Sequence, residues 1–197
     1  GVYLEPYYSK RSYGEGYAKR GSTGLILRFK DGHDDGVNKF RLRIESFIQD
    51  VLTWSPKKKI QEDEVCLVVV PGHQRGPANE GNAFRRIFRS HTRLRDRDFS
   101  TKVIRNKEIY NHNDRASKLR RNYEVSEQEV TLEVKDPEDF KDKYILIFDD
   151  IYTSGSTMNA VIEKLCVHQP KAIFFTDRNS NVGFENSSQQ GRFGGII

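Results

Sequence analysis

The sequence predicts an α/β fold: an open, mostly parallel sheet with helices on both faces. Three runs of apolar, largely β-branched or aromatic residues are typical of parallel strands buried on both faces: "VCLVVV" at 65–70, "YILIF" at 144–148 and "KAIFFTD" at 171–177. Segments with helical periodicity separate these runs, which is the order of βαβ units. The length of 197 residues suits one domain with a core of its own.

Apolar residues recur at spacings of three and four in three segments, which predicts amphipathic helices. The expected apolar faces are Phe40, Ile44, Phe47, Ile48 and Val51 in the first helix, Phe84, Ile87, Phe88 and Leu94 in the second, and Met158, Val161, Ile162, Leu165 and Cys166 in the third. "GLILRFK" at 24–30 is consistent with either a strand or a short apolar helix, and "EVTLEV" at 129–134 with a short strand. Residues 95–122 are polar and basic, with little periodicity.

Charge is unevenly distributed along the chain. Residues 85–121 carry 13 Lys/Arg against 4 Asp/Glu, a net charge of +9, whereas the rest of the chain carries −4. This asymmetry indicates an anionic partner, such as phosphates, pyrophosphate or single-stranded nucleic acid. The alternative, that this segment is only a solvated helix and loop, stays open. Five tyrosines within residues 1–23 can stack on bases, although a tyrosine-rich hairpin packed on the core is the favoured interpretation.

Several classes of protein are disfavoured. Cys66 and Cys166 lie among apolar neighbours without a nearby Cys/His cluster, so we expect buried, reduced thiols and no zinc site. No apolar run approaches the ~20 residues of a membrane span, and no charged-then-apolar leader opens the sequence. We therefore expect a cytoplasmic protein without membrane contact. Walker A and nucleophile-elbow motifs are absent.

The stretch "YILIFDDIYTSGSTMNAVIEKL" at 144–165 carries the strongest functional signal. Its strand places Asp149 and Asp150 at the carboxyl edge of the sheet, where adjacent carboxylates repel each other unless sugar hydroxyls or a hydrated cation bind them. "TSGST" at 153–157 then enters a helix, whose first turn offers unpaired N–H groups to an anion. Gly155 permits close approach of the backbone. The combination suggests a ribose 5-phosphate ligand.

A purely structural interpretation of the same stretch is also possible. The Ser and Thr side chains would then cap the helix, and the two aspartates would form a turn. The unbroken order of strand, acid pair, small-residue loop and helix favours the ligand site.

The motif "ILIFDDIYTSGST" resembles the phosphoribosyl-pyrophosphate (PRPP) binding motif of type I phosphoribosyltransferases. With a tyrosine at position 152, the motif resembles the ComF-like, competence-associated branch of that family. Three further segments resemble this branch: "LILRFKDGHD", "VVVPGHQRGPANEGNAF" and "VIRN…SKLRRNYEV". The similarity is close over 145–157 and loose over 24–177. In the pyrophosphate loop, "GHQRG" stands where the family has Arg-Gly-Gly or Lys-x-x-Gly.

The resemblance implies a role for each matched position. The acids Asp149 and Asp150 would hold the ribose 2- and 3-hydroxyls at the catalytic centre. The 5-phosphate would be bound by Thr153, Ser154, Gly155, Ser156 and Thr157. Pyrophosphate and Mg²⁺ would face the loop formed by Pro71, Gly72, His73, Gln74 and Arg75. A flexible flap would include Arg105 and Lys107.

The implied activity is Mg²⁺-dependent transfer of a phosphoribosyl group from PRPP to an unknown acceptor, with release of pyrophosphate. The ligands would be PRPP or a nucleoside 5-monophosphate. The alternative is a PRPP-fold protein that binds or modifies nucleic acid in DNA uptake or defence. We expect a single domain over 1–180, with a variable hood or hairpin at 1–23 and a flexible tail at 181–197. A homo-oligomer is compatible with the resemblance.

Overall fold

The computed structural model describes residues 14–19, 23–53, 59–72, 74–91, 93–107, 131–149, 156–175 and 195–196. Its α-helices are α2 (Thr23–Lys30), α3 (Asp34–Leu52), α4 (Ala83–Ser90) and α7 (Ser156–Cys166). Its 3₁₀-helices are η1 (Gly14–Lys19), η2 (Glu62–Glu64), η3 (Arg95–Arg97), η4 (Ser100–Lys102) and η5 (Pro137–Phe140). Its strands are β1 (Val65–Val69), β2 (Gly76–Pro77), β3 (Val103–Arg105), β4 (Leu132–Val134), β5 (Tyr144–Phe148), β6 (Ala172–Phe175) and β7 (Gly195–Ile196).

The main sheet has the strand order β1-β5-β6-β7. β5 pairs in parallel with both β1 and β6, whereas β7 runs antiparallel to β6. A second, antiparallel sheet has the order β2-β3-β4. The three parallel strands are the three apolar runs of the sequence, so the predicted α/β class with a mostly parallel sheet is confirmed.

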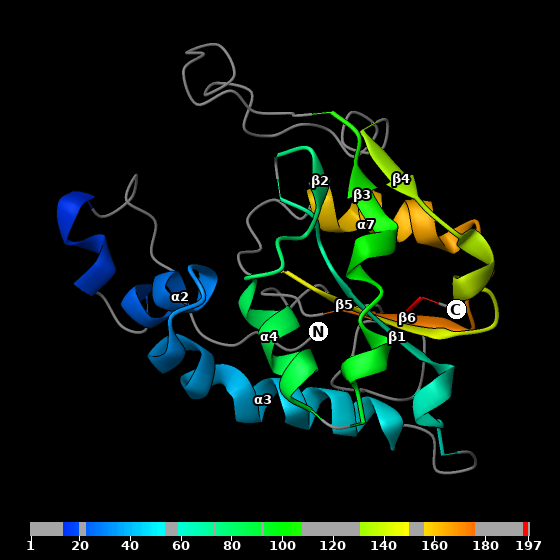
Figure 1. The fold of residues 1–197 in the computed structure, drawn as a ribbon, viewed down its shortest axis with the longest axis horizontal. Coiled ribbons are helices and arrows are strands. Elements are labelled where there is room, and N and C mark those ends of the chain that lie inside the picture. Colours follow the sequence, from blue (N-terminus) through cyan, green and yellow to red (C-terminus); the bar gives the residue numbers. More distant parts are fainter. Residues whose placement is uncertain are drawn as a thin grey trace, which may run out of the picture.

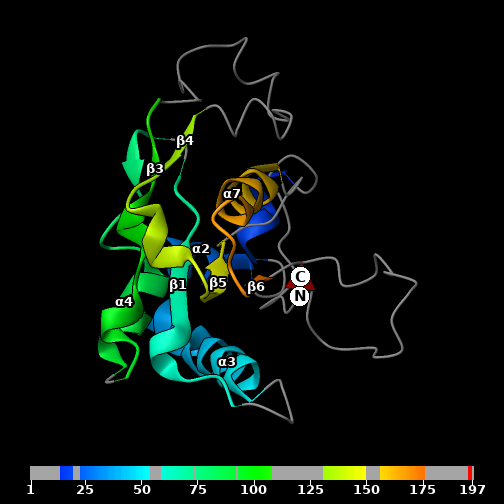
Figure 2. The ribbon, with the colours of Figure 1, turned by 90° about the vertical axis from the view of Figure 1, so that its right-hand side faces the viewer.

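Helices cover both faces of the parallel sheet, as predicted. Along β1, Val65, Leu67 and Val69 belong to a core cluster with residues of α2, α3 and α4. The alternate residues Cys66 and Val68 belong to a second cluster with residues of α7, β3 and β4. Figure 1 shows α3 below β5 and β6 and α7 above them, and the turned view in Figure 2 agrees. Both faces of each strand are therefore buried, which explains the continuous apolar runs.

The predicted helical faces are largely confirmed. All five predicted apolar residues of α3 are buried, and so are those of α7 except for Cys166, which is half-buried. "GLILRFK" belongs to α2 and is helical. Leu94 is buried as expected, but it lies beyond the end of α4 at Ser90.

Of the second sheet, β4 lies within the strand expected at 129–134, whereas β2, β3 and their pairing were not predicted. β3 lies inside the basic stretch that shows little periodicity, and it has only three residues, too few for an alternating pattern to be recognised. Within the expected N-terminal hairpin, Gly14–Lys19 form a 3₁₀-helix instead. Within the expected flexible tail, Gly195–Ile196 pair with β6. The rest of 1–22 and of 181–197 lies outside the described residues, and the domain boundaries stay a prediction.

Cys66 provides a test of burial through the pH dependence of stability. Its side chain is 1% exposed, and burial raises the pKa of the thiol from 9.0 to about 11, although nearby cations including Lys143 lower it in part. Between these two values the unfolded chain loses the thiol proton while the folded chain keeps it, so stability falls as the pH rises. We expect the free energy of unfolding, measured with urea, to fall more steeply from pH 9 to 11 in the wild type than in Cys66→Ala. Parallel curves for the two proteins would contradict this expectation.

Candidate functional site

The ends of β1 and β5 lie next to each other at one edge of the main sheet. Val69 is opposite Phe148 in the parallel register, and the N–H of Val70 donates to the carbonyl of Phe148 at 2.9 Å. Pro71 and Asp149 follow directly. The two loops predicted to bind PRPP therefore leave the sheet from adjacent strands, at the carboxyl edge where open α/β sheets bind ligands.

The acid pair and phosphate loop are partly described by the structure. Asp149 is half-buried directly after β5. Asp150 and residues 151–155, which include Thr153, Ser154 and Gly155, lie outside the described residues. α7 begins at Ser156, and Thr157 is half-buried in its first turn. α7 packs on the sheet through Met158 and Val161. Its first turn, which carries unpaired N–H groups, is the end of the helix nearest to Asp149 in the sequence. The ligand roles of these residues stay predictions.

The loop after β1 has a buried start and an exposed middle. Pro71 is buried, whereas Gly72, Gln74 and Arg75 are exposed; His73 lies outside the described residues. Gly76 then has a φ of 118°, a conformation that favours glycine. The exposed Gln74 and Arg75 are thus accessible to a ligand at this edge, and their contact with pyrophosphate stays a prediction.

Arg105 differs from its predicted place in a flexible flap. It is the last residue of β3, the central strand of the second sheet, and is 1% exposed. Its Nε donates to the carbonyl of Gly72 at 2.7 Å, and its Nη1 donates to the hydroxyl of Thr131. Lys107 is exposed just beyond the strand, and its assignment to a flap stays a prediction.

Several cations of the basic segment already have partners within the fold. Arg85 pairs with Asp98 at 2.7 Å, Arg86 with Asp34 at 2.5 Å, and the exposed Arg93 with Glu62 at 3.2 Å. The last of these pairs lies at the amino end of β1, since η2 leads directly into that strand. Part of the excess positive charge is therefore structural, and nucleic-acid binding by this segment stays a prediction.

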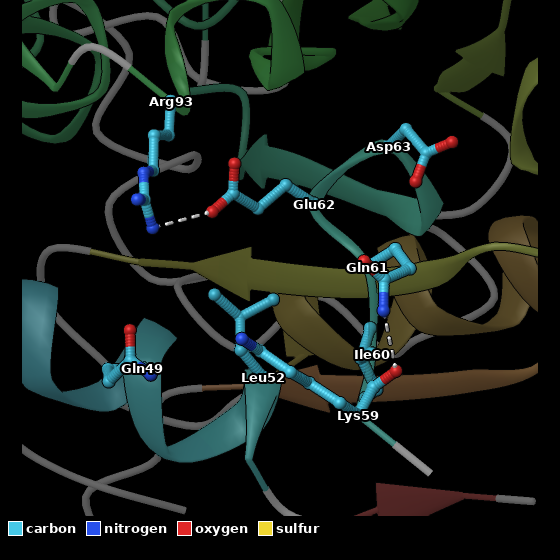
Figure 3. Close-up of a pocket in the computed structure, with 8 residues that line it drawn as sticks. All are labelled: Gln49, Leu52, Lys59, Ile60, Gln61, Glu62, Asp63 and Arg93. Atoms are coloured by element: carbon cyan, nitrogen blue, oxygen red, sulfur yellow. Dashed lines mark hydrogen bonds and ion pairs between the residues drawn. The ribbon is translucent and has the colours of Figure 1, made fainter.

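A cavity of about 510 Å³ lies away from the predicted ligand edge (Figure 3). It is lined by Gln49, Leu52, Lys59, Ile60, Gln61, Glu62, Asp63 and Arg93. Residues 59–63 lead into the amino end of β1, so this cavity is at the opposite edge of the sheet. Figure 3 shows the Arg93 guanidinium turned toward Glu62. Its cation is therefore already paired with this carboxylate. Sequence reasoning missed it because its residues come from three separate segments without a shared pattern.

The described residues contain neither a cluster of metal-binding side chains nor a helix suited to crossing a membrane. Within these ranges, no three or more His, Cys, Asp or Glu side chains gather as a metal site would require. In the same part of the chain, none of the helices combines the length and the apolar character needed to cross a membrane.

The segment that contains the motif at 145–157 is similar to a known protein family. Residues 101–183 match the family model described as the phosphoribosyl transferase domain. The match covers less than half of the chain, but it includes Asp149–Thr157 and the strands β3 to β6. The Pro71–Arg75 loop lies outside it. No curated protein and no solved structure matches the chain. The matched segment is therefore similar to type I phosphoribosyltransferases, which supports phosphoribosyl transfer in general terms.

Proposed function

We propose that this protein binds PRPP with Mg²⁺ at the carboxyl edge of β1 and β5 and transfers its phosphoribosyl group to an acceptor, releasing pyrophosphate. The observation that carries the proposal is the position of Asp149. It follows β5, lies in the segment similar to a phosphoribosyl transferase domain, and is adjacent to the loop that leaves β1.

Two loops that leave adjacent strands suit PRPP, in which a ribose separates a phosphate from a pyrophosphate. Asp149 and Asp150 accept hydrogen bonds from the ribose hydroxyls. Residues 153–157, which precede and enter α7 in the sequence, bind the 5-phosphate through N–H and hydroxyl groups. The loop 71–75, with the exposed Arg75, binds the pyrophosphate. The substrate then lies along the sheet edge with its C1 carbon between the two loops.

The transfer is a substitution at C1 of the ribose. The bond from C1 to the pyrophosphate oxygen breaks, and pyrophosphate leaves with the electron pair. C1 forms a bond with the lone pair of the acceptor, which afterwards loses any proton that the new bond makes acidic. Positive charge develops on the ribose, where the carboxylates of Asp149 and Asp150 stabilise it through the bound sugar. Positioning supplies the rest of the rate enhancement, so no covalent nucleophile is required.

The donor chemistry of this edge fits Mg²⁺. Asp149 provides carboxylate oxygens at a half-exposed position, and Mg²⁺ prefers one or two carboxylates together with water and substrate phosphates. Asp149 and Asp150 would hold the hydrated ion next to the ribose. When bound, Mg²⁺ neutralises charge on the leaving pyrophosphate.

We place the protein in the ComF-like branch, on the strength of Tyr152 and the three similar segments. The acceptor is then a base or another nucleophile. Because residues 85–121 carry a net charge of +9, the alternative is a protein of the same fold that acts on nucleic acid. Location in the cytoplasm and self-association remain part of this proposal.

A thermal-shift screen tests the proposal. A ligand at 100 times its dissociation constant stabilises the fold by about 2.7 kcal/mol, which corresponds to a rise of about 5–10 °C in Tm for a chain of this size. We expect such a rise with PRPP that is larger when Mg²⁺ is present, and a rise with a nucleoside 5-monophosphate that needs no metal. A shift with a short single-stranded oligonucleotide alone would favour the alternative, and no shift with any of the three would contradict both.

A further inference from the structure

Arg105 is buried beneath the loop that follows β1. Its side chain is directed to two neutral acceptors, the carbonyl of Gly72 at 2.7 Å from Nε and the hydroxyl of Thr131. Its third nitrogen, Nη2, is buried and has no hydrogen-bond partner among the residues that the structure describes. Buried polar groups of proteins are nearly always paired, so an unpaired N–H on a guanidinium is a feature that requires an explanation.

The same residue holds both ends of the loop. Its side chain holds Gly72 at the start, and its backbone pairs with Gly76 at the end. The positive φ of Gly76 lets the chain turn back onto β3. The orientation of the Gly72 peptide is fixed as a result: its carbonyl oxygen, which would repel a phosphate, is turned toward Arg105.

The charge of Arg105 is not compensated within the described part of the chain. Burial lowers the pKa of its guanidinium to about 10, so it is still protonated at neutral pH. Arg85 is similarly buried but has Asp98 at 2.7 Å, whereas the recorded partners of Arg105 are uncharged. A buried cation without a counter-ion is costly, and an anion bound at the loop above would reduce that cost.

We propose that Arg105 is a positioning residue for pyrophosphate, which holds Gly72 and Gly76 at the two ends of the loop after β1 and places a buried positive charge beneath Gly72. This inference rests on the proposed function and assigns the pyrophosphate end of that site. It replaces the flap role that the sequence suggested for Arg105. The 5-phosphate end, which belongs to the loop after β5, does not depend on this residue.

The test compares two ligands in calorimetric titrations. Arg105→Met is expected to weaken binding of inorganic pyrophosphate with Mg²⁺ by at least about tenfold, equivalent to 1.4 kcal/mol, and to leave binding of a nucleoside 5-monophosphate within about twofold. Arg105→Lys keeps the charge but lacks the planar fork that reaches two acceptors, so we expect an intermediate loss. Lys141→Met removes the same charge from an exposed position in the loop before β5, and both affinities should stay at the wild-type values.

Thr131→Val provides a milder variant in case Arg105→Met does not fold. It removes the acceptor of Nη1 and should selectively weaken pyrophosphate binding by several fold. Unchanged pyrophosphate affinity in these variants, or an equal loss for both ligands, would overturn the inference while the proposed function stands. A wild-type protein that binds neither ligand would overturn the proposed function and this inference together.

Discussion

Phe148→Ala is expected to lower the free energy of unfolding by about 3–5 kcal/mol, the usual cost of truncating a fully buried phenylalanine. Phe148 is 0% exposed. Its ring contacts those of Phe47, Phe84 and Phe88, with centroid distances of 5.6, 5.3 and 5.1 Å. The substitution therefore removes three aromatic pairs and leaves a cavity between α3, α4 and the sheet.

Phe148 also precedes Asp149, so the same cavity should disturb the ligand edge. Urea denaturation followed by circular dichroism measures the loss in stability. Leu42→Ala is the control, because Leu42 is 75% exposed on α3 and should change stability by less than about 0.5 kcal/mol. If Phe148→Ala costs less than about 1 kcal/mol, the ring does not hold the core together as the contacts indicate.

Asp98→Ala should cost about 3–5 kcal/mol, because it leaves the guanidinium of Arg85 buried without its counter-ion. The two side chains are 5% and 7% exposed and 2.7 Å apart. Arg85 also donates to the carbonyl of Ala78 at 3.0 Å. Asp98 accepts from the N–H of Ser100, whose hydroxyl in turn accepts from the N–H of Val69. The pair thus connects the loop before α4 to the end of β1.

Two comparisons show whether burial is the reason for this cost. Arg93→Ala breaks an exposed pair with Glu62, 71% and 38% exposed, and should cost less than about 1 kcal/mol. Arg85→Met combined with Asp98→Leu removes both charges and should be less destabilising than Asp98→Ala alone. Equal losses for Asp98→Ala and Arg93→Ala, measured by the same denaturation experiment, would show that the buried pair has no special role.

The parallel sheet and its main helices could be predicted because each is specified by a local pattern. Val65–Val69 and Tyr144–Phe148 are continuous apolar runs, which are typical of a strand covered on both faces. α3 repeats its apolar residues at helical spacing over 19 residues. The acid pair after β5 was chosen as a candidate site for the same reason, since strand, acids, loop and helix follow one another without interruption, and its ligand role stays a prediction.

The pairing of the second sheet and the roles of individual arginines could not be predicted. β2 has two residues and β3 has three, and their pairing depends on segments far apart in the sequence. Arg85 and Arg105 look like other members of a basic segment. Only the fold shows that both are buried and that one of them faces a carboxylate while the other faces a loop carbonyl.

Calorimetric titration of PRPP with Mg²⁺ into the wild type and into Asp149→Asn/Asp150→Asn tests the central claim most directly. We expect saturable binding by the wild type. In the double variant we expect affinity to fall by at least about tenfold, or 1.4 kcal/mol, with the circular dichroism spectrum unchanged, because the proposed function assigns these carboxylates to the ligand rather than to the core. Absence of heat from the wild type at ~1 mM PRPP, far above the dissociation constants usual for enzyme substrates, would contradict the account, and so would equal affinities of the two proteins.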